Sequence, residues 1–294
     1  MPRHFLTGAE LGPADLERVL DRAAALKCEP HTSRALAGRA VALIFQRPST
    51  RTRLSFEVGV AELHGQPLVL RPDELQLSRG ESLRDTALVL SRHVAVIGVR
   101  TGEHRVLEEL ARHGSVPVVN MLTAEHHPCQ ALADLMTLRE AFGELRGRRL
   151  AYVGDGNNVA RSLVVLGGVA GVEVVVASPE GYGLGPADVD GARATSDPVE
   201  AVAGAHAVYT DVWVSMGDEG TAAERRRVLA PFRLDETLLA AAAPGAIAMH
   251  CLPAHPGEEI TEGVLYGERQ RIWDQAENRR HAQKALLEWL VGAL

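Results

Sequence analysis

The chain has 294 residues, 46% of them hydrophobic, and a net charge of −7, which indicates a soluble globular protein of two ordinary domains and argues against a nucleic-acid-binding surface. The amino-terminal segment lacks the apolar core of a secretory signal, and no apolar run is long enough to cross a bilayer, so we expect a cytoplasmic protein without membrane contact. Three widely spaced cysteines argue against a disulfide framework or a zinc ribbon.

Short apolar runs alternate with helical patterns through the first half of the chain. Pro13 to Lys27 has the spacing of an amphipathic helix. After it we expect strands over residues 41–45, 67–70, 94–99 and 116–119, and helices after Ser49 and over 83–90, 104–112 and 130–142. This alternation predicts a parallel sheet covered by helices on both faces.

The turn after the first predicted strand carries the sequence Ser49-Thr-Arg-Thr-Arg53. Two arginines have the wrong charge for a helix amino terminus, because the macrodipole and the free N–H groups there favour an anion. With three hydroxyl groups on the same turn, a phosphate is the expected occupant, although a plain helix cap with surface charge is the alternative.

The same helix is expected to bury Leu54, Val58 and Ala61, which recur at helical spacing. Arg51 then lies nearly in line with Val58 and faces the ligand. Arg53 lies roughly opposite and is expected to be solvated or ion-paired.

Arg51, Arg100 and His127 are each expected beyond the carboxyl end of a predicted strand, where parallel sheets bind ligands. Because they are far apart in sequence, their convergence on one edge is stronger evidence than any one of them. Alone, His127 is equally well interpreted as a buried, hydrogen-bonded histidine. A metal site built from His126, His127 and Cys129 is disfavoured, since no second ligand pair accompanies it.

A second alternating series follows the Gly-rich, basic segment 143–149, near which we place a domain boundary. Strands are expected over 150–153, 172–176, 205–210 and 246–249, with a helix over 157–169. A long helix from Ala276 to Leu290, with Arg279 in its first turn, is expected to pack back on the first domain. The sequence thus predicts an α/β fold of two doubly wound parallel-sheet domains, residues 1–138 with 276–294 and residues 139–275.

The segment from Gly154 to Ala160 lies between a strand and a helix and partly matches a dinucleotide-binding fingerprint. Val159 replaces the third glycine, and the next strand ends in Ala177-Ser178 without the acidic residue that binds a ribose. A nicotinamide-dependent oxidoreductase is therefore the disfavoured alternative. The glycines are interpreted as a tight turn that exposes asparagine side chains.

Other polar residues near strand ends, such as Asp211 and Cys251, are ambiguous when each is taken alone. Six segments taken together are more specific: Ser49-Thr-Arg-Thr-Arg53, His127-Pro-Cys-Gln130, Gly154-Asp-Gly-Asn-Asn158, Asp211-Val-Trp-Val-Ser-Met-Gly217, His250-Cys-Leu-Pro253 and Ala276-Glu-Asn-Arg279. They occur in the order seen in the transcarbamoylases, and the chain resembles that family almost end to end. The segments at Asp211 and His250 are similar to its ornithine-specific branch.

This resemblance implies an enzyme that transfers the carbamoyl group of carbamoyl phosphate to the δ-amino group of L-ornithine, without a cofactor or a metal. The implied catalytic residues are Arg51, Arg100, His127, Asp211 and Cys251. The implied carbamoyl phosphate ligands are Ser49, Thr50, Arg51, Thr52, Gln76, Arg100, His127, Gln130, Cys251, Leu252 and Arg279. The implied ornithine ligands are Asn158, Asp211, Ser215 and Met216.

Members of this family form catalytic trimers, so the resemblance also implies a homotrimer or a multiple of trimers. Gln76 then serves its own site or that of a neighbouring subunit, although Arg79-Gly80-Glu81 departs from the basic pattern expected beside it. A relative that acts on another amine, such as putrescine, lysine or an acylated ornithine, stays open, because the width of the amine pocket cannot be read from sequence.

Overall fold

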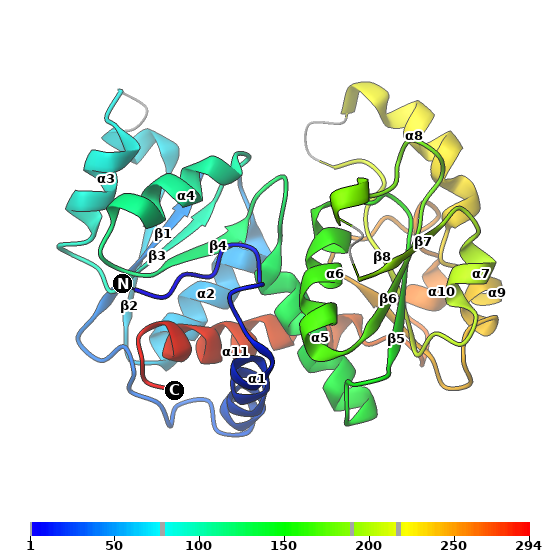
Figure 1. Cartoon of the computed structure of the whole chain (residues 1–294), viewed down its shortest axis with the longest axis horizontal. Coiled ribbons are helices and arrows are strands. Elements are labelled where there is room, and N and C mark those ends of the chain that lie inside the picture. Colours follow the sequence, from blue (N-terminus) through cyan, green and yellow to red (C-terminus); the bar gives the residue numbers. More distant parts are fainter. Residues whose placement is uncertain (1, 77–79, 189–190, 216–218) are drawn as a thin grey trace. The chain divides into compact units, whose positions relative to one another are not determined.

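The computed structural model in Figure 1 describes residues 2–76, 80–188, 191–215 and 219–294. It contains two compact units. The first consists of Met1–Met136 with Glu277–Leu294, and the second of Thr137–Ala276. Each unit is built around one parallel sheet, so the predicted class of two parallel-sheet α/β domains is confirmed. The carboxyl-terminal helix belongs to the first unit over most of its length, as predicted.

The sheet of the first unit has the strand order β2-β1-β3-β4. The strands are β1 (Ala40–Phe45), β2 (Gln66–Leu70), β3 (Val96–Arg100) and β4 (Val118–Leu122). Leu43 of β1 lies opposite Val69 on one side and Gly98 on the other. The central strands β1 and β3 are buried almost throughout, which explains their unbroken apolar sequences.

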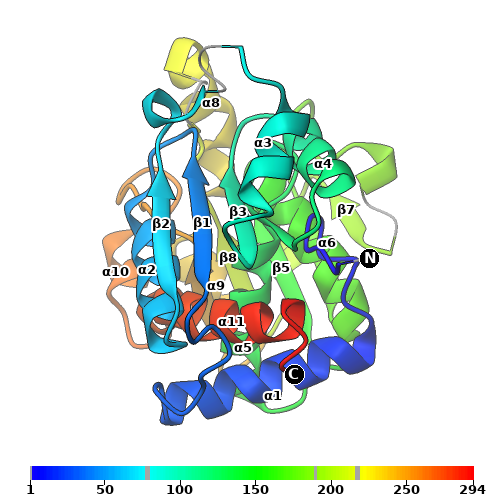
Figure 2. The ribbon, with the colours of Figure 1, turned by 90° about the vertical axis from the view of Figure 1, so that its left-hand side faces the viewer.

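Helices cover both faces of this sheet (Figures 1 and 2). The helices α3 (Leu83–Leu90) and α4 (His104–His113) share an apolar cluster with residues of β1, β3 and β4. The other helices are α1 (Pro13–Cys28), α2 (Thr50–Glu62), the start of α5 (Pro128–Phe142) and most of α11 (Ile272–Leu290). An ion pair from Arg22 to Glu288 ties α1 to α11, with 2.6 Å between Nε and Oε2.

The predicted buried face of α2 is wrong. Leu54 and Val58 are 56% and 38% exposed, whereas α2 buries Thr52, Ser55, Phe56, Gly59 and Val60. The reason is close packing against α11: a Cβ at Gly59 would lie 3.3 Å from Cγ of Lys284. The residues that contact α11, Thr52, Gly59 and Glu62, are small or polar, so apolar spacing alone points to the wrong side of the helix.

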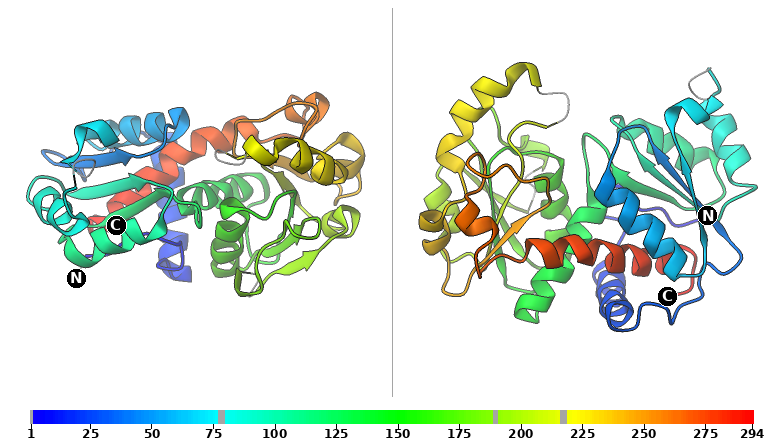
Figure 3. Two further views of the ribbon diagram at one scale, coloured as in Figure 1. Left: turned by 90° about the horizontal axis from the view of Figure 1, so that it is seen from above. Right: turned by 180° about the vertical axis from the view of Figure 1, so that it is seen from behind.

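The sheet of the second unit has the order β7-β6-β5-β8-β9, with all its strand pairs parallel. The strands are β5 (Arg149–Val153), β6 (Glu173–Ala177), β7 (Arg193–Thr195), β8 (Ala207–Thr210) and β9 (Ile247–His250). On one face, the sheet is covered by α7 (Pro198–Val202), α9 (Glu236–Ala240) and α10 (Glu262–Leu265) (Figure 3). These helices share an apolar cluster with residues of the strands. On the other, α6 (Asn158–Ala170) approaches β6 so closely that a Cβ at Gly167 would clash with Val174.

Two differences from the sequence-based elements matter for the site. The helix α11 begins at Ile272 rather than Ala276, so Arg279 lies in its interior and not in its first turn. The short elements β7, α7, α8 (Ala222–Leu229), α9 and α10 were not expected from the sequence. In the described part of the chain, no helix combines the length and apolarity that crossing a bilayer requires.

Candidate active site in two parts

The amino terminus of α2 lies just beyond β1 in the first unit and has the geometry of an anion site. Ser49 is the N-cap residue, and its Oγ accepts a hydrogen bond from the Thr52 amide at 3.3 Å. Thr52 is buried, Arg51 is half-buried and Thr50 is exposed. Arg53 points away to an exposed ion pair with Glu57, 3.0 Å from Nε to Oε1, as predicted.

Arg279 joins three elements of the first unit through its guanidinium group. Its Nη1 donates to Oε1 of Gln130 at 2.7 Å, and its Nη2 donates to Oγ1 of Thr52 at 2.7 Å. All three side chains are buried. The structure therefore brings Arg279 of α11, Gln130 of α5 and the first turn of α2 together, although the chain separates them widely.

Arg100 ends β3 and His127 directly precedes α5, and both side chains are buried. The pKa of His127 lies well below its ordinary value, first because burial disfavours the imidazolium and then because Arg279 and Arg100 are nearby positive charges. His127 is therefore a neutral histidine that can donate or accept a hydrogen bond beside two cations. Gln76, the last described residue before the gap at 77–79, is exposed.

Cys129 is the other reactive side chain in this region. Its thiol donates to the Asn120 carbonyl at 3.3 Å, and burial raises its pKa to about 12 although Arg279 acts in the opposite direction. The groups of described residues whose ligand atoms lie close enough together to hold a metal ion do not include His126, His127 and Cys129.

In the second unit, Asp211 follows β8 and is the centre of a hydrogen-bonded group. Its Oδ2 accepts from Nδ2 of Asn157 at 2.7 Å, and its Oδ1 accepts from the thiol of Cys251 at 2.7 Å. The carboxylate is 6% exposed. Neither of these two donors carries a positive charge that would pair with the carboxylate.

Asn157 is a residue that sequence reasoning noticed but did not assign to the site. Its Oδ1 caps α6 by accepting from the amides of Val159 and Ala160, at 2.9 and 3.2 Å. Its amide nitrogen is then directed at Asp211. The available signal was an asparagine at the first position of the predicted helix, on the same sheet edge as a carboxylate, since asparagine is a preferred N-cap residue.

Cys251 and Leu252 follow β9 and are partly buried. The amide of Leu252 donates to Nδ1 of His250 at 2.8 Å. On the other side of the imidazole ring, Nε2 of His250 lies 3.1 Å from Oε1 of Glu259. Burial opposes ionisation of Glu259, but hydrogen bonds from His250 and from the His255 amide outweigh it and lower its pKa. These hydrogen bonds support the turn that carries Cys251.

Two further predicted ornithine ligands, Asn158 and Ser215, lie on the same edge of the second sheet. Asn158 begins α6, and Ser215 follows β8 by five residues; both are partly buried. Met216 lies outside the described residues. Two groups in the described chain have ligand atoms within 4.8 Å of one another and could hold a metal ion: Asp211, His250 and Cys251, and His255, Glu258 and Glu259.

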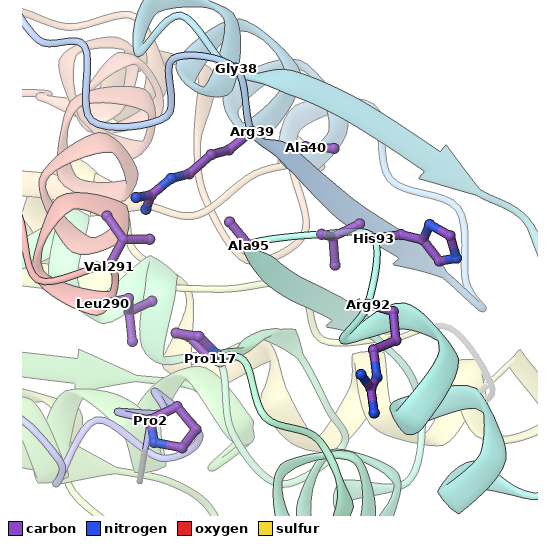
Figure 4. A pocket seen from close by; sticks show the side chains of 11 residues that line it. Pro2, Gly38, Arg39, Ala40, Arg92, His93, Ala95, Pro117, Leu290 and Val291 are labelled. Carbon is purple, nitrogen blue, oxygen red and sulfur yellow. The ribbon is translucent and has the colours of Figure 1, made fainter.

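A cavity of about 510 Å³ lies at the opposite end of the first sheet (Figure 4). It is lined by residues next to the amino ends of the strands, among them Arg39, Ala40, Ala95 and Pro117. Arg39 extends toward Val291 at the end of α11. Because parallel sheets bind substrates at the carboxyl ends of their strands, we do not place the active site in this cavity.

Comparison with known proteins finds two family models along the chain, and the second of them includes the carboxyl-terminal helix. Residues 3–140 match the carbamoyl phosphate-binding domain of aspartate/ornithine carbamoyltransferase, and residues 146–290 match the aspartate/ornithine-binding domain. The ornithine carbamoyltransferase of Acidothermus cellulolyticus is 54% identical, with 100% of this chain and 98% of the relative covered.

Solved structures agree over the whole length. That of ornithine carbamoyltransferase from Pyrococcus furiosus has a TM-score of 0.95 at 44% identity, covering 100% of this chain and 98% of the other. A mutant N-acetyl-L-ornithine transcarbamylase has a TM-score of 0.87 at 31% identity, covering 98% and 99% of the two chains. The chain therefore belongs to the aspartate/ornithine carbamoyltransferase family.

Proposed function

We propose that the protein transfers the carbamoyl group of carbamoyl phosphate to the δ-amino group of L-ornithine, giving L-citrulline and phosphate, a reaction of arginine biosynthesis. Relatives about as similar as the Acidothermus protein carry the name ornithine carbamoyltransferase over almost the full chain. The observation that carries the proposal is that each unit has a buried group of opposite charge. One gathers Arg100 and Arg279 around His127, and the other is centred on the carboxylate of Asp211.

The first unit binds carbamoyl phosphate. Ser49, Thr50, Arg51 and Thr52 hold the phosphate at the amino terminus of α2, where free amides favour an anion. Arg100, His127, Gln130 and Arg279 complete the site, and Gln76 serves its own or a neighbouring copy. Negative charge develops on the carbonyl oxygen during attack, and Arg100, His127, Thr52 and Arg279 stabilise it. His127 does so as a neutral hydrogen-bond donor, since its pKa is strongly lowered.

The second unit binds ornithine. Asp211 receives the α-ammonium group, and Asn158, Ser215 and Met216 complete the site. Cys251 and Leu252 lie beside the carbamoyl group and the attacking amine. An alkyl ammonium has a pKa of about 10.4, so the δ-amine must lose a proton before it attacks. A desolvated site near arginine side chains favours the neutral amine.

Incubation with carbamoyl phosphate and a panel of amines tests the proposal. We expect phosphate release and a ureido product with L-ornithine, and little of either with putrescine, L-lysine or N-acetyl-L-ornithine. The acylated substrate is the specific alternative, because a structural relative bears the name N-acetyl-L-ornithine transcarbamylase. Preference for that substrate would change the assigned amine, and no transfer to any amine would contradict a carbamoyltransferase.

We also propose a homotrimer, or a multiple of trimers, in the cytoplasm. In support, the first unit exposes four apolar side chains on α2 and α3: Leu54, Val58, Leu88 and Val89. Three free cysteines are consistent with a reducing compartment. Light scattering should give a mass of three chains or a multiple of three, and a monomer at micromolar concentration would contradict the assembly.

A further inference from the structure

Arg225 of α8 is far less exposed than the arginine that follows it. Its side chain is 14% exposed, compared with 50% for Arg226. Its Nε donates to the Trp213 carbonyl at 2.6 Å, and its Nη2 pairs with the carboxylate of Asp155. The guanidinium also lies over the ring of Tyr182, 5.2 Å from the centroid. One side chain therefore contacts three different loops of the second unit.

Two of these loops carry the proposed ornithine ligands. Trp213 lies two residues after Asp211 and two before Ser215, on the segment that follows β8. Asp155 lies three residues before Asn158, on the turn between β5 and α6. Because β5 and β8 are neighbours in the sheet, both loops leave the same edge. Arg225 is thus a bridge between the two segments that hold the substrate.

The contact between Arg225 and Tyr182 adds a second connection to the turn at Asp155. The Gly156 amide donates to the Tyr182 carbonyl at 2.7 Å, and a Cβ at Gly156 would lie only 2.7 Å from the Leu184 amide nitrogen. The turn at Asp155 is therefore packed directly against the loop that follows β6. With its guanidinium over Tyr182, Arg225 contacts a loop that is already attached to the same turn.

We propose that Arg225 is a positioning residue that sets the spacing between Asp211 and Asn158, and so determines the affinity for ornithine. This inference rests on the proposed function. Arginine suits the role because its planar group offers donors in two directions at once, one to a carbonyl and one to a carboxylate. Lysine carries the same charge on a single nitrogen and cannot reproduce both contacts with the same geometry.

The test compares Arg225→Gln, Arg225→Lys and Asp155→Asn with the wild type, with Arg226→Gln as the matched control. Arg226 is the next residue of the same helix and forms a half-exposed ion pair with Glu258, 2.9 Å from Nε to Oε1. For each variant, kcat and the KM of each substrate are measured. We expect Arg225→Gln and Asp155→Asn to raise the KM for L-ornithine at least tenfold and to leave that for carbamoyl phosphate within twofold. Arg225→Lys should restore only part of the loss, and Arg226→Gln should change neither constant by more than twofold.

The outcomes separate this inference from the proposed function. An ornithine KM within twofold of the wild type in folded Arg225→Gln or Arg225→Lys would overturn the positioning role while the function stands. Equal increases in both KM values would also overturn it, because they would indicate general damage. If the wild type prefers another amine, the same comparison is made with that amine. If it carbamoylates none, the proposed function and this inference both fail.

Discussion

The buried groups proposed to bind the two substrates carry charges of opposite sign, one in each unit. In each unit, the pKa of a neighbouring side chain is shifted by these charges. In the first unit, Arg279 and Arg100 add to the effect of burial in lowering the pKa of His127. In the second unit, burial raises the pKa of Tyr152 well above its ordinary value, and the negative charges of Asp211 and Asp155 raise it further. The first site thus favours an anion and the second a cation. The two proposed substrates, a phosphorylated donor and an amino acid acceptor, have these charges.

A buried charge is informative about ligands only when its partners are considered. Asp211 accepts from an amide and a thiol, and neither of these donors is charged. Lys284 differs: its ammonium is fully buried but donates to the carboxylate of Glu62 and to the carbonyls of Leu26 and Pro30. The fold neutralises the charge of Lys284, so we assign this lysine to stability and not to binding.

The largest effect is expected from removing the cation at the phosphate site. Arg51→Ala should lower kcat/KM by about a thousandfold, because charge-assisted contacts to the leaving phosphate are lost, while the fold stays intact. Arg53→Ala, which removes only the exposed pair with Glu57, should stay within twofold. Near-normal turnover by Arg51→Ala would remove the phosphate assignment.

The next largest effect is expected from replacing Lys284, and it should lower stability without changing substrate binding. Lys284→Met should lower the free energy of unfolding by about 3 kcal/mol, because it leaves the buried carboxylate of Glu62 without its lysine. Lys27→Met, which removes a half-buried bond of 2.8 Å from Nζ to Oδ1 of Asn278, should cost about 1 kcal/mol. Urea unfolding measures both values. A changed KM in folded Lys284→Met would break the distinction between structural and ligand-binding charges.

The division of substrates between the units is tested by Asp211→Ala. We expect the KM for L-ornithine to rise about a hundredfold, since one charge-assisted contact to the ammonium is lost, and the KM for carbamoyl phosphate to change little. Asp235→Asn, at the N-cap of α9 in the same unit, serves as the control because asparagine preserves the cap. Equal increases in both constants would contradict a separate site for each substrate.

Much of the fold could be predicted because its central strands are unbroken apolar runs. The strands β1 and β5 lie within a residue of their expected bounds. The helix α2 was predicted, but its buried face was not, because small and polar residues of α2 pack against α11, which lies more than 200 positions away in the chain. The short elements between β6 and β9 have too few residues for a periodic signal.

Strand ends and the order of the segments were enough to propose residues for the candidate site, but they did not indicate the hydrogen-bond partners of those residues. The bond from Asn157 to Asp211 and the bonds from Arg279 to Thr52 and Gln130 depend on tertiary packing. Arg225 was missed for the same reason. It lies in a run of three arginines on a helix that was not expected, and only the folded chain separates it from the exposed Arg226.

The smallest expected effect concerns the neutral state of His127. Its folded-state pKa is lowered, so the unfolded chain binds a proton that the folded chain refuses, and stability falls as the pH drops below about 6.5. One such group contributes at most about 1.4 kcal/mol per pH unit. Three other histidines with lowered pKa values, His4, His206 and His281, contribute in the same direction.

His127→Asn should therefore make the slope of unfolding free energy between pH 7.5 and pH 5 shallower without removing it, as measured by urea unfolding. The matched control is His64→Asn, since His64 is exposed and has a positive φ of 62° that asparagine tolerates. A slope in His127→Asn as steep as that of the wild type would show that burial and the two nearby arginines do not keep this histidine neutral.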